Sequence, residues 1–131
     1  MKDKSTVSKA FNKHFFDFLS DLQSIFPDSK EIMFAKTSFE TIKRLNTTAI
    51  IKAWYTSVSL PYGNEISNGN IDFFINKDYS ADLADVNKND EIIKMIERIR
   101  TPIATTTDVN KEHCLKYLQN LNKLSIAYQN L

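Results

Sequence analysis

Glycine, proline and cysteine are all scarce in this chain. Its 131 residues include two Gly, three Pro and one Cys. Because β architectures need Gly and Pro at their many turns, this scarcity favours long helices. Two glycines also exclude a glycine-rich phosphate loop. A single cysteine, Cys114, excludes a disulfide within the chain and fits a reducing compartment.

Neither a dominant charge nor a long apolar run is present. The 17 basic and 16 acidic residues give a formal net charge of +1, so no long-range field toward nucleic acid or an anionic membrane is indicated. No run approaches the roughly 18 apolar residues of a spanning helix. The N-terminal stretch MKDKSTVSKAFNK lacks the apolar segment of a signal peptide. We therefore expect a protein that is neither secreted nor inserted in a membrane.

Apolar residues recur at three- and four-residue steps through most of the sequence, which predicts amphipathic helices. At 131 residues, with 42% hydrophobic and 25% charged residues, the chain fits one soluble domain covering residues 1–131. The apolar stripes run from Val7 to Phe26, Ile32 to Leu45, Ile50 to Val58, Ile92 to Ile99 and Val109 to Tyr128.

Prolines and capping residues set the predicted helix ends. Pro27, Pro61 and the pair Thr101-Pro102 should each stop the preceding helix. Asn46 should end the second helix, because Asn tolerates the left-handed conformation. The expected N-caps are Asp28 (with Glu31 three residues later), Thr47 or Thr48, Asn89 or Asp90, and Thr107 or Asp108.

The centre of the chain lacks a clear helical period. Residues 62–70 should be irregular, with a turn at Asn68-Gly69. Residues 71–75 suit a short helix or an extended segment packed on the core, and residues 78–88 suit a loop or short helix. The predicted fold is therefore all-α: a single-domain bundle of about five helices with an irregular central segment.

The sequence offers no recognisable catalytic or metal-binding set. The two histidines, His14 and His113, have no partners at metal-ligand spacing. Because His113 and Cys114 are adjacent, a Cys–His pair could form only through His14 across the fold. A calcium loop laid from Asp85 lacks the required Gly and the final Glu. We predict no catalytic residue, no metal and no cofactor, and hence not an enzyme; an enzyme with a dispersed site is the third hypothesis.

Aromatic residues concentrate in the central segment, and this block is the predicted partner-binding surface, since aromatics dominate interface anchors. It comprises Trp54, Tyr62, Phe73, Phe74, Lys77, Asp78 and Tyr79. Packing in the core is the alternative, because large aromatics at helical spacing usually pack. A third interpretation combines base stacking by Trp54 with phosphate contacts by Lys52 and Lys77. Four aspartates between residues 72 and 85 oppose that interpretation.

Two phenylalanines, Phe16 and Phe34, lie off the main apolar stripe of their helices. A helix with apolar residues on two sides is either deeply buried or contacts a second protein. This pattern favours self-association or a docked protein subunit.

Three segments carry a resemblance to a known group of proteins. They are FNKHFFDFLSDLQSIFPDSKEI, IIKAWYTSVSLPYGNEISNGNIDFFINKDYSADL and YLQNLNKLSIAY, with residues 69–83 the most specific part. Over nearly its whole length the chain resembles a small uncharacterised protein family of giant DNA viruses of algae and protists. The resemblance implies a viral origin, and it carries no activity and no functional residues.

The resulting prediction is a non-enzymatic viral protein that acts through protein–protein contacts, as a virion component or an infection-stage adaptor. Its partner would be a viral or host protein or a second copy, and it would reside in host cytoplasm or the virion. A nucleic-acid-binding accessory protein is the alternative.

Overall fold

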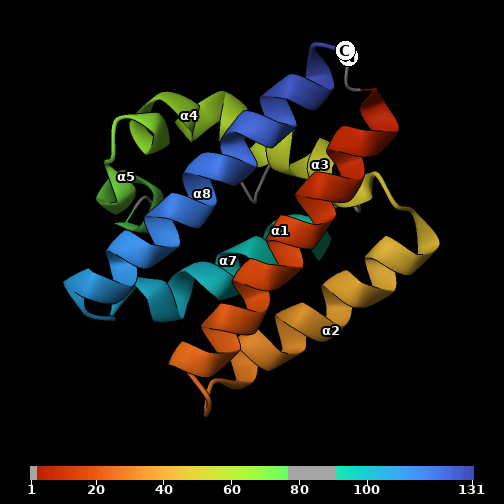
Figure 1. Ribbon diagram of the computed structural model, residues 1–131. Helices are drawn as coiled ribbons and strands as arrows, with labels where there is room; N and C mark the ends of the chain where they lie inside the picture. The colour runs from red at the N-terminus through yellow and green to blue at the C-terminus, as the bar shows by residue number, and fades with distance from the viewer. Residues whose placement is uncertain (1–2, 77–90) are drawn as a thin grey trace.

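Two long antiparallel helices, α1 (Lys4–Ile25) and α8 (Asp108–Gln129), lie side by side along the molecule (Figure 1). The computed structural model describes residues 3–76 and 91–131, and every secondary-structure element within these ranges is helical. The predicted all-α, single-domain bundle is therefore confirmed.

The other described elements pack around this pair. They are α2 (Lys30–Leu45), α3 (Ala49–Trp54), the π-helix η1 (Tyr55–Ser59), α4 (Leu60–Ser67), α5 (Ile71–Asn76) and α7 (Glu91–Ala104). Helix α2 packs between α1 and α7, whereas η1 and α4 pack against α8. Helix α5 bridges α4 and α7.

The centre of the core is a cluster of aromatic rings around Phe15. The Phe15 ring lies 4.8 Å from Phe39 of α2, 5.8 Å from Trp54 of α3 and 5.9 Å from Phe11 of α1, centroid to centroid. The Phe39 and Trp54 contacts are edge-to-face, the arrangement that ring quadrupoles favour. All four side chains are buried. One side chain therefore joins three helices.

Local sequence explains how the first two helices begin and end. The Asp3 carboxylate accepts a hydrogen bond of 2.8 Å from the Thr6 N–H and caps α1. Helix α1 ends at Ile25, as Pro27 predicted. The cap of α2 is Ser29, whose hydroxyl accepts from the Ile32 N–H at 3.3 Å, so the assignment to Asp28 was wrong by one residue.

Asn46 ends α2, but not in the left-handed conformation that was predicted. Its backbone is extended, with φ −152° and ψ 106°. The Asn46 side-chain oxygen instead accepts hydrogen bonds from the Thr48 N–H and hydroxyl, both at 3.1 Å. This Asx-type turn directs the chain into α3.

Pro61 does not end the third helix, contrary to the prediction. The chain continues through α3, η1 and α4 without a break. At the end of η1 the Leu60 N–H donates to the Tyr55 carbonyl, five residues earlier. Pro61 then falls in the first turn of α4, where a residue without an N–H is tolerated.

The central segment is more regular than predicted, because residues 60–67 form α4. The turn at Asn68-Gly69 is confirmed. Gly69 has a φ of 84°, and the Asn70 N–H donates to the Glu65 carbonyl at 2.8 Å, as in a Schellman motif. Residues 71–76 form the short helix α5. The predicted loop at 78–88 and the caps at Asn89 and Asp90 lie outside the described residues.

The last two helices follow the predicted order with one correction. Pro102 lies inside α7, which continues to Ala104. A proline φ is compatible with a helix, and the missing donor and the crowding of the carbonyl four residues earlier fall here in the last turn, where the helix ends two residues later. The next helix starts as predicted, with the Thr107 hydroxyl accepting from the Asn110 N–H at 3.2 Å.

We expect Phe15→Ala to lower the free energy of unfolding by about 3–5 kcal/mol, because it removes the ring that joins three helices. Phe15→Leu should cost roughly 1–2 kcal/mol, since it keeps most of the volume. Urea unfolding followed by fluorescence of Trp54, the only Trp, measures both changes. Equal, small losses for the two variants would contradict a central role for this ring.

Candidate functional site

Three of the residues predicted to form a partner-binding surface are in the core. Trp54, Tyr62 and Phe74 are each 2% exposed. The Tyr62 and Phe74 rings contact each other edge-on, with centroids 6.5 Å apart. Their aromatic mass is used for packing, so the prediction that they form an exposed contact surface was wrong.

The rest of that predicted set cannot be placed in a site. Lys77, Asp78 and Tyr79 lie outside the described residues, and Phe73 belongs to α5 with its side chain outside the description. Buried Trp54 also cannot stack on a base, although Lys52 is exposed. The base-stacking interpretation therefore loses its central aromatic.

Phe16 and Phe34, the off-stripe phenylalanines, have different environments. Phe16 is half-buried, with the Lys43 ammonium 5.2 Å above its ring. Phe34 is 51% exposed and has the Arg98 guanidinium 4.6 Å above its ring. Phe34 thus fits the expectation of an apolar residue that faces outward.

The outer face of α2 forms an exposed, uncharged stripe, which we call the α2 stripe. It consists of Met33, Thr37, Thr41 and Leu45, four residues apart, with Phe34 beside Met33. Met33 is 51% exposed and Leu45 is 82% exposed. The Thr37 hydroxyl donates to the Met33 carbonyl at 3.1 Å, and the Thr41 hydroxyl to the Thr37 carbonyl at 3.2 Å. Since both hydroxyls bond to their own helix, neither needs a partner elsewhere.

A second candidate site joins both histidines across the α1–α8 pair. The Asp21 carboxylate accepts from the Tyr117 hydroxyl at 2.6 Å and pairs with His113 Nε2 at 3.0 Å. The His14 ring lies 4.8 Å from the Tyr117 ring, and its buried Nε2 has no hydrogen-bond partner. Sequence analysis missed this cluster because its members come from two helices about 90 residues apart.

The electrostatics of this cluster give it no activated nucleophile. Burial raises the pKa of the neighbouring Cys114 thiol to about 11. Burial, with the Asp21 hydrogen bond, raises the pKa of Tyr117 to about 12. Both groups are therefore protonated at neutral pH. The hydrogen bonds from Tyr117 and His113 lower the pKa of Asp21, so its carboxylate stays ionised and holds α1 to α8.

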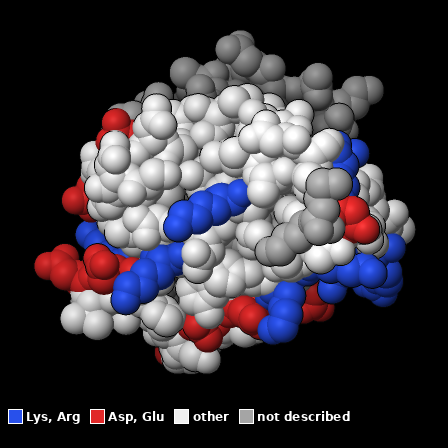
Figure 2. Space-filling view, turned by 45° about the horizontal axis from the view of Figure 1, so that its top comes forward, with Lys and Arg blue, Asp and Glu red and all other residues white. Residues whose placement is uncertain are grey.

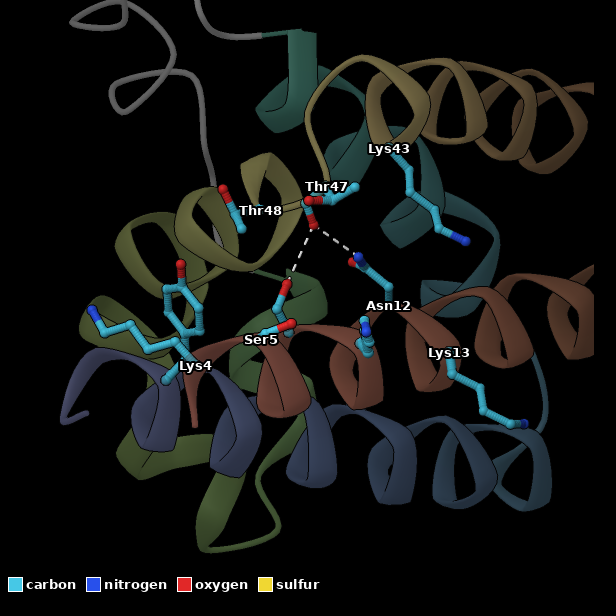
Figure 3. Close-up of a pocket in the computed structure, with 10 residues that line it drawn as sticks. Lys4, Ser5, Asn12, Lys13, Lys43, Thr47 and Thr48 are labelled. Atoms are coloured by element: carbon cyan, nitrogen blue, oxygen red, sulfur yellow. Dashed lines mark hydrogen bonds between the residues drawn. The ribbon is translucent and has the colours of Figure 1, made fainter. Parts of the chain in front are cut away.

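The third candidate is a groove on the side of α1 that faces the turn between α2 and α3 (Figure 3). Asn12 Nδ2 donates to the Thr47 carbonyl at 2.8 Å, and the Ser8 hydroxyl donates to the same oxygen at 3.3 Å. These bonds fix the turn on α1 and leave a hollow of about 590 Å³. The charged and aromatic residues that line this hollow are Lys4, Lys9, Lys13, Lys43 and Tyr128.

Basic residues dominate this groove and its neighbour. A second hollow of about 540 Å³ shares Lys43 and Thr47 with the first and adds Lys36, Arg44 and Glu40. Within the described part of the chain, six basic residues and one acidic residue line the two hollows. The whole sequence has nearly equal numbers of the two kinds, 17 and 16. On the face drawn in Figure 2, basic side chains lie across the middle of the surface, with acidic side chains at its left and lower edges. We call the two hollows together the cationic groove.

Part of this pattern was present in the sequence. Lys9 and Lys13 are four residues apart and share one face of α1, and the α2 stripe repeats every fourth residue. Lys43 and Tyr128 join the groove only through the tertiary fold.

Comparisons with known proteins give no family for this chain: no family model, no curated protein and no solved structure matches it. Among residues 3–76 and 91–131, no group of three or more His, Cys, Asp or Glu is placed to hold a metal ion. Nor does any helix in that part of the chain have the length and apolar character that crossing a bilayer requires.

The buried, unpaired Nε2 of His14 should make the stability of the protein depend on pH. Burial lowers the pKa of His14 below its usual 6.5. As the pH falls, His14 is therefore protonated in the unfolded chain at a higher pH than in the folded protein. Acidification from about pH 7.5 to about pH 5.5 should therefore lower the free energy of unfolding. His14→Gln should reduce that loss, as measured by urea unfolding at both pH values.

Asp21 remains ionised over this interval, because its pKa lies below 3.8. Its own stabilising contribution is present above that value and is lost only as the pH falls through the lower folded-state pKa. An unchanged pH dependence in His14→Gln would show that His14 is not the source of the loss.

Proposed function

We propose that this protein is not an enzyme and acts through protein–protein contacts, and that its α2 stripe pairs with the same stripe of a second copy. The observation that supports this most directly is the exposed, uncharged face of α2, with Met33 and Phe34 each 51% exposed and Leu45 82% exposed. Exposed apolar side chains grouped on one face mark interaction surfaces more often than scattered ones do.

The spacing of the stripe suits helix pairing. Met33, Thr37, Thr41 and Leu45 form one ridge of residues four apart, and two such ridges interdigitate in the commonest class of helix packing. In an antiparallel pair that crosses at this ridge, Thr37 of one copy faces Thr41 of the other, and these small side chains allow the helices to approach closely. Met33 and Leu45 lie at the two edges of the contact, because three four-residue steps turn their directions about 120° apart.

Charge favours the same arrangement. Glu31 lies in the first turn of α2, and Lys43 and Arg44 lie in the last turn. Antiparallel pairing brings Glu31 of each helix toward Lys43 and Arg44 of the other, and it also aligns the helix dipoles favourably. A closed two-fold arrangement of this kind is the commonest form of homo-oligomer.

The inert nucleophiles support the non-enzymatic part of the proposal. The Cys114 thiol is buried, with its pKa raised to about 11, and the Asp21 carboxylate is engaged by Tyr117 and His113. Neither hollow of the cationic groove is lined by His14, Asp21 or His113.

We expect Thr41→Arg to abolish self-association, because it places two charges at the centre of the two-fold contact. Sedimentation velocity over a concentration series up to about 0.1 mM measures the effect. Thr101→Arg is the matched control, since Thr101 is also exposed and its hydroxyl also bonds to a carbonyl four residues earlier. The control should associate like the wild type.

Two outcomes would overturn the self-pairing. The wild type could be monomeric throughout the series, or both arginine variants could dissociate equally. In either case the stripe would need a different protein as its partner.

We further propose that the protein belongs to a giant-virus particle or to the infected host cytoplasm, and this part rests on the family resemblance alone. Quantitative mass spectrometry of purified particles should find it at a fixed ratio to the major capsid protein if it is a structural component. Its absence from particles and abundance in infected cells would instead favour an infection-stage adaptor. Absence from both would remove the viral assignment.

A further inference from the structure

We propose that the cationic groove binds a chain of phosphate groups, such as the backbone of a single-stranded nucleic acid. This goes beyond the contact function of the α2 stripe and is centred on α1, although Lys43 and Arg44 at the end of α2 lie beside both surfaces. It also differs from the base-stacking hypothesis, because it uses none of Trp54, Phe73 or Lys77.

Positive charge is in local excess at the groove. Among the described residues, six basic side chains line it and Glu40 is the only acidic one. Like charges gathered in a concave surface repel one another, and that cost is offset when an anion binds and releases its counterions.

In residues 3–76 and 91–131, little of this charge is neutralised by firm contacts. Lys13 pairs with Asp17 at 3.1 Å, but both side chains are more than half exposed, so solvent and salt screen the pair. Lys9 lies near enough to Asp3 to lower the pKa of that carboxyl. Lys4 and Lys43 lie over the rings of Tyr128 and Phe16, at 5.0 Å and 5.2 Å from the ring centres. Each of these contacts is weak enough to be exchanged for a phosphate.

The spacing of the lysines favours an extended ligand. Lys4 and Lys13 are separated by nine residues of α1, or about 14 Å along the helix axis. Figure 3 shows their ammonium groups directed toward opposite ends of the groove, with Lys43 across from them. A single phosphate cannot contact all three, whereas an extended polyanion can. A rigid duplex does not fit into a hollow of about 590 Å³, so a flexible strand is favoured.

Among its described lining residues, the groove has no aromatic ring open for stacking on a base. The aromatic residues there are Tyr128, which is 7% exposed, and Phe16, which is half-buried, and a lysine lies over each ring. Binding should therefore depend on phosphates and be nearly independent of sequence.

The test uses the full chain and a fluorescein-labelled oligothymidylate of about 12 nucleotides, a typical length for a single-strand site. Fluorescence anisotropy is measured from about 50 to about 200 mM salt. The groove variant carries Lys4→Gln, Lys9→Gln and Lys13→Gln, which leave α2 unchanged. The control variant carries Lys52→Gln, Lys116→Gln and Lys123→Gln, at exposed positions that do not line the groove.

Both variants change the formal net charge by the same amount, from +1 to −2 (1 − 3). The wild type should bind with a clear salt dependence. The groove variant should bind about tenfold or more weakly, with a slope of log K against log salt shallower by about 2, since each phosphate that a lysine no longer neutralises reduces the slope by about 0.7. The control variant should keep nearly the wild-type slope. Circular dichroism confirms that both variants fold.

Three results would overturn the proposal: binding of neither the oligonucleotide nor inorganic polyphosphate by the wild type at low salt, equal weakening in both variants, or an unchanged slope in the groove variant. Direct titration of the wild type with inorganic polyphosphate, followed by isothermal titration calorimetry, separates the two sources of a phosphate chain. Binding of polyphosphate without binding of the oligonucleotide would keep the phosphate-chain site and exclude nucleic acid as its ligand.

Discussion

The Phe15 ring is the contact on which the rest of the structure depends. It joins α1 to α2 through Phe39 and to α3 through Trp54, so the position of α2 follows from it. The bonds of Asn12 and Ser8 to the Thr47 carbonyl then fix the far end of α2 on the same face of α1. Both proposed surfaces lie on α2: the stripe on its outer side, and the cationic groove where its C-terminal end meets α1. An error in the packing of one ring would therefore disturb both.

The helices were predictable because their signal is local. A period of 3.6 residues in apolar positions defines the buried face of α1 and α8, and Asp3 or Thr107 supplies an acceptor for free N–H groups within three residues. The prolines were less reliable as stops. Pro27 follows a helix end, but Pro61 and Pro102 lie within helical segments, since a proline lacks one donor and its φ remains helical. Whether that missing donor ends a helix depends on the neighbouring turns, which the sequence pattern does not show.

The candidate sites were harder to predict, because whether a residue is buried or exposed is a tertiary property. Trp54 and Tyr62 suit a contact surface and a core equally well by chemistry, and the fold places them in the core. The cationic groove draws its residues from α1, the end of α2 and the last turn of α8, so no window of the sequence contains it. The Asp21 cluster is equally dispersed. The α2 stripe is the exception, since it lies on one helix and only its exposure had to be established.

The π-turn in η1 sets which residues of the continuous helical segment α3–η1–α4 face the core. Ile50, Trp54, Val58, Tyr62 and Ile66 are spaced by four residues, and all are buried. In an uninterrupted α-helix each four-residue step rotates the side chain by about 40°, so the last of the five would point about 160° away from the first. The π-turn accommodates about one additional residue and reverses roughly 100° of that rotation, which keeps all five within one apolar face. Deleting one residue from Tyr55–Ser59 would restore α geometry and keep Tyr62 and Ile66 on the buried face, whereas α geometry without the deletion would turn both away from the core. The spacing of the apolar residues and the local widening of the helix are thus one coupled feature, and neither can change alone.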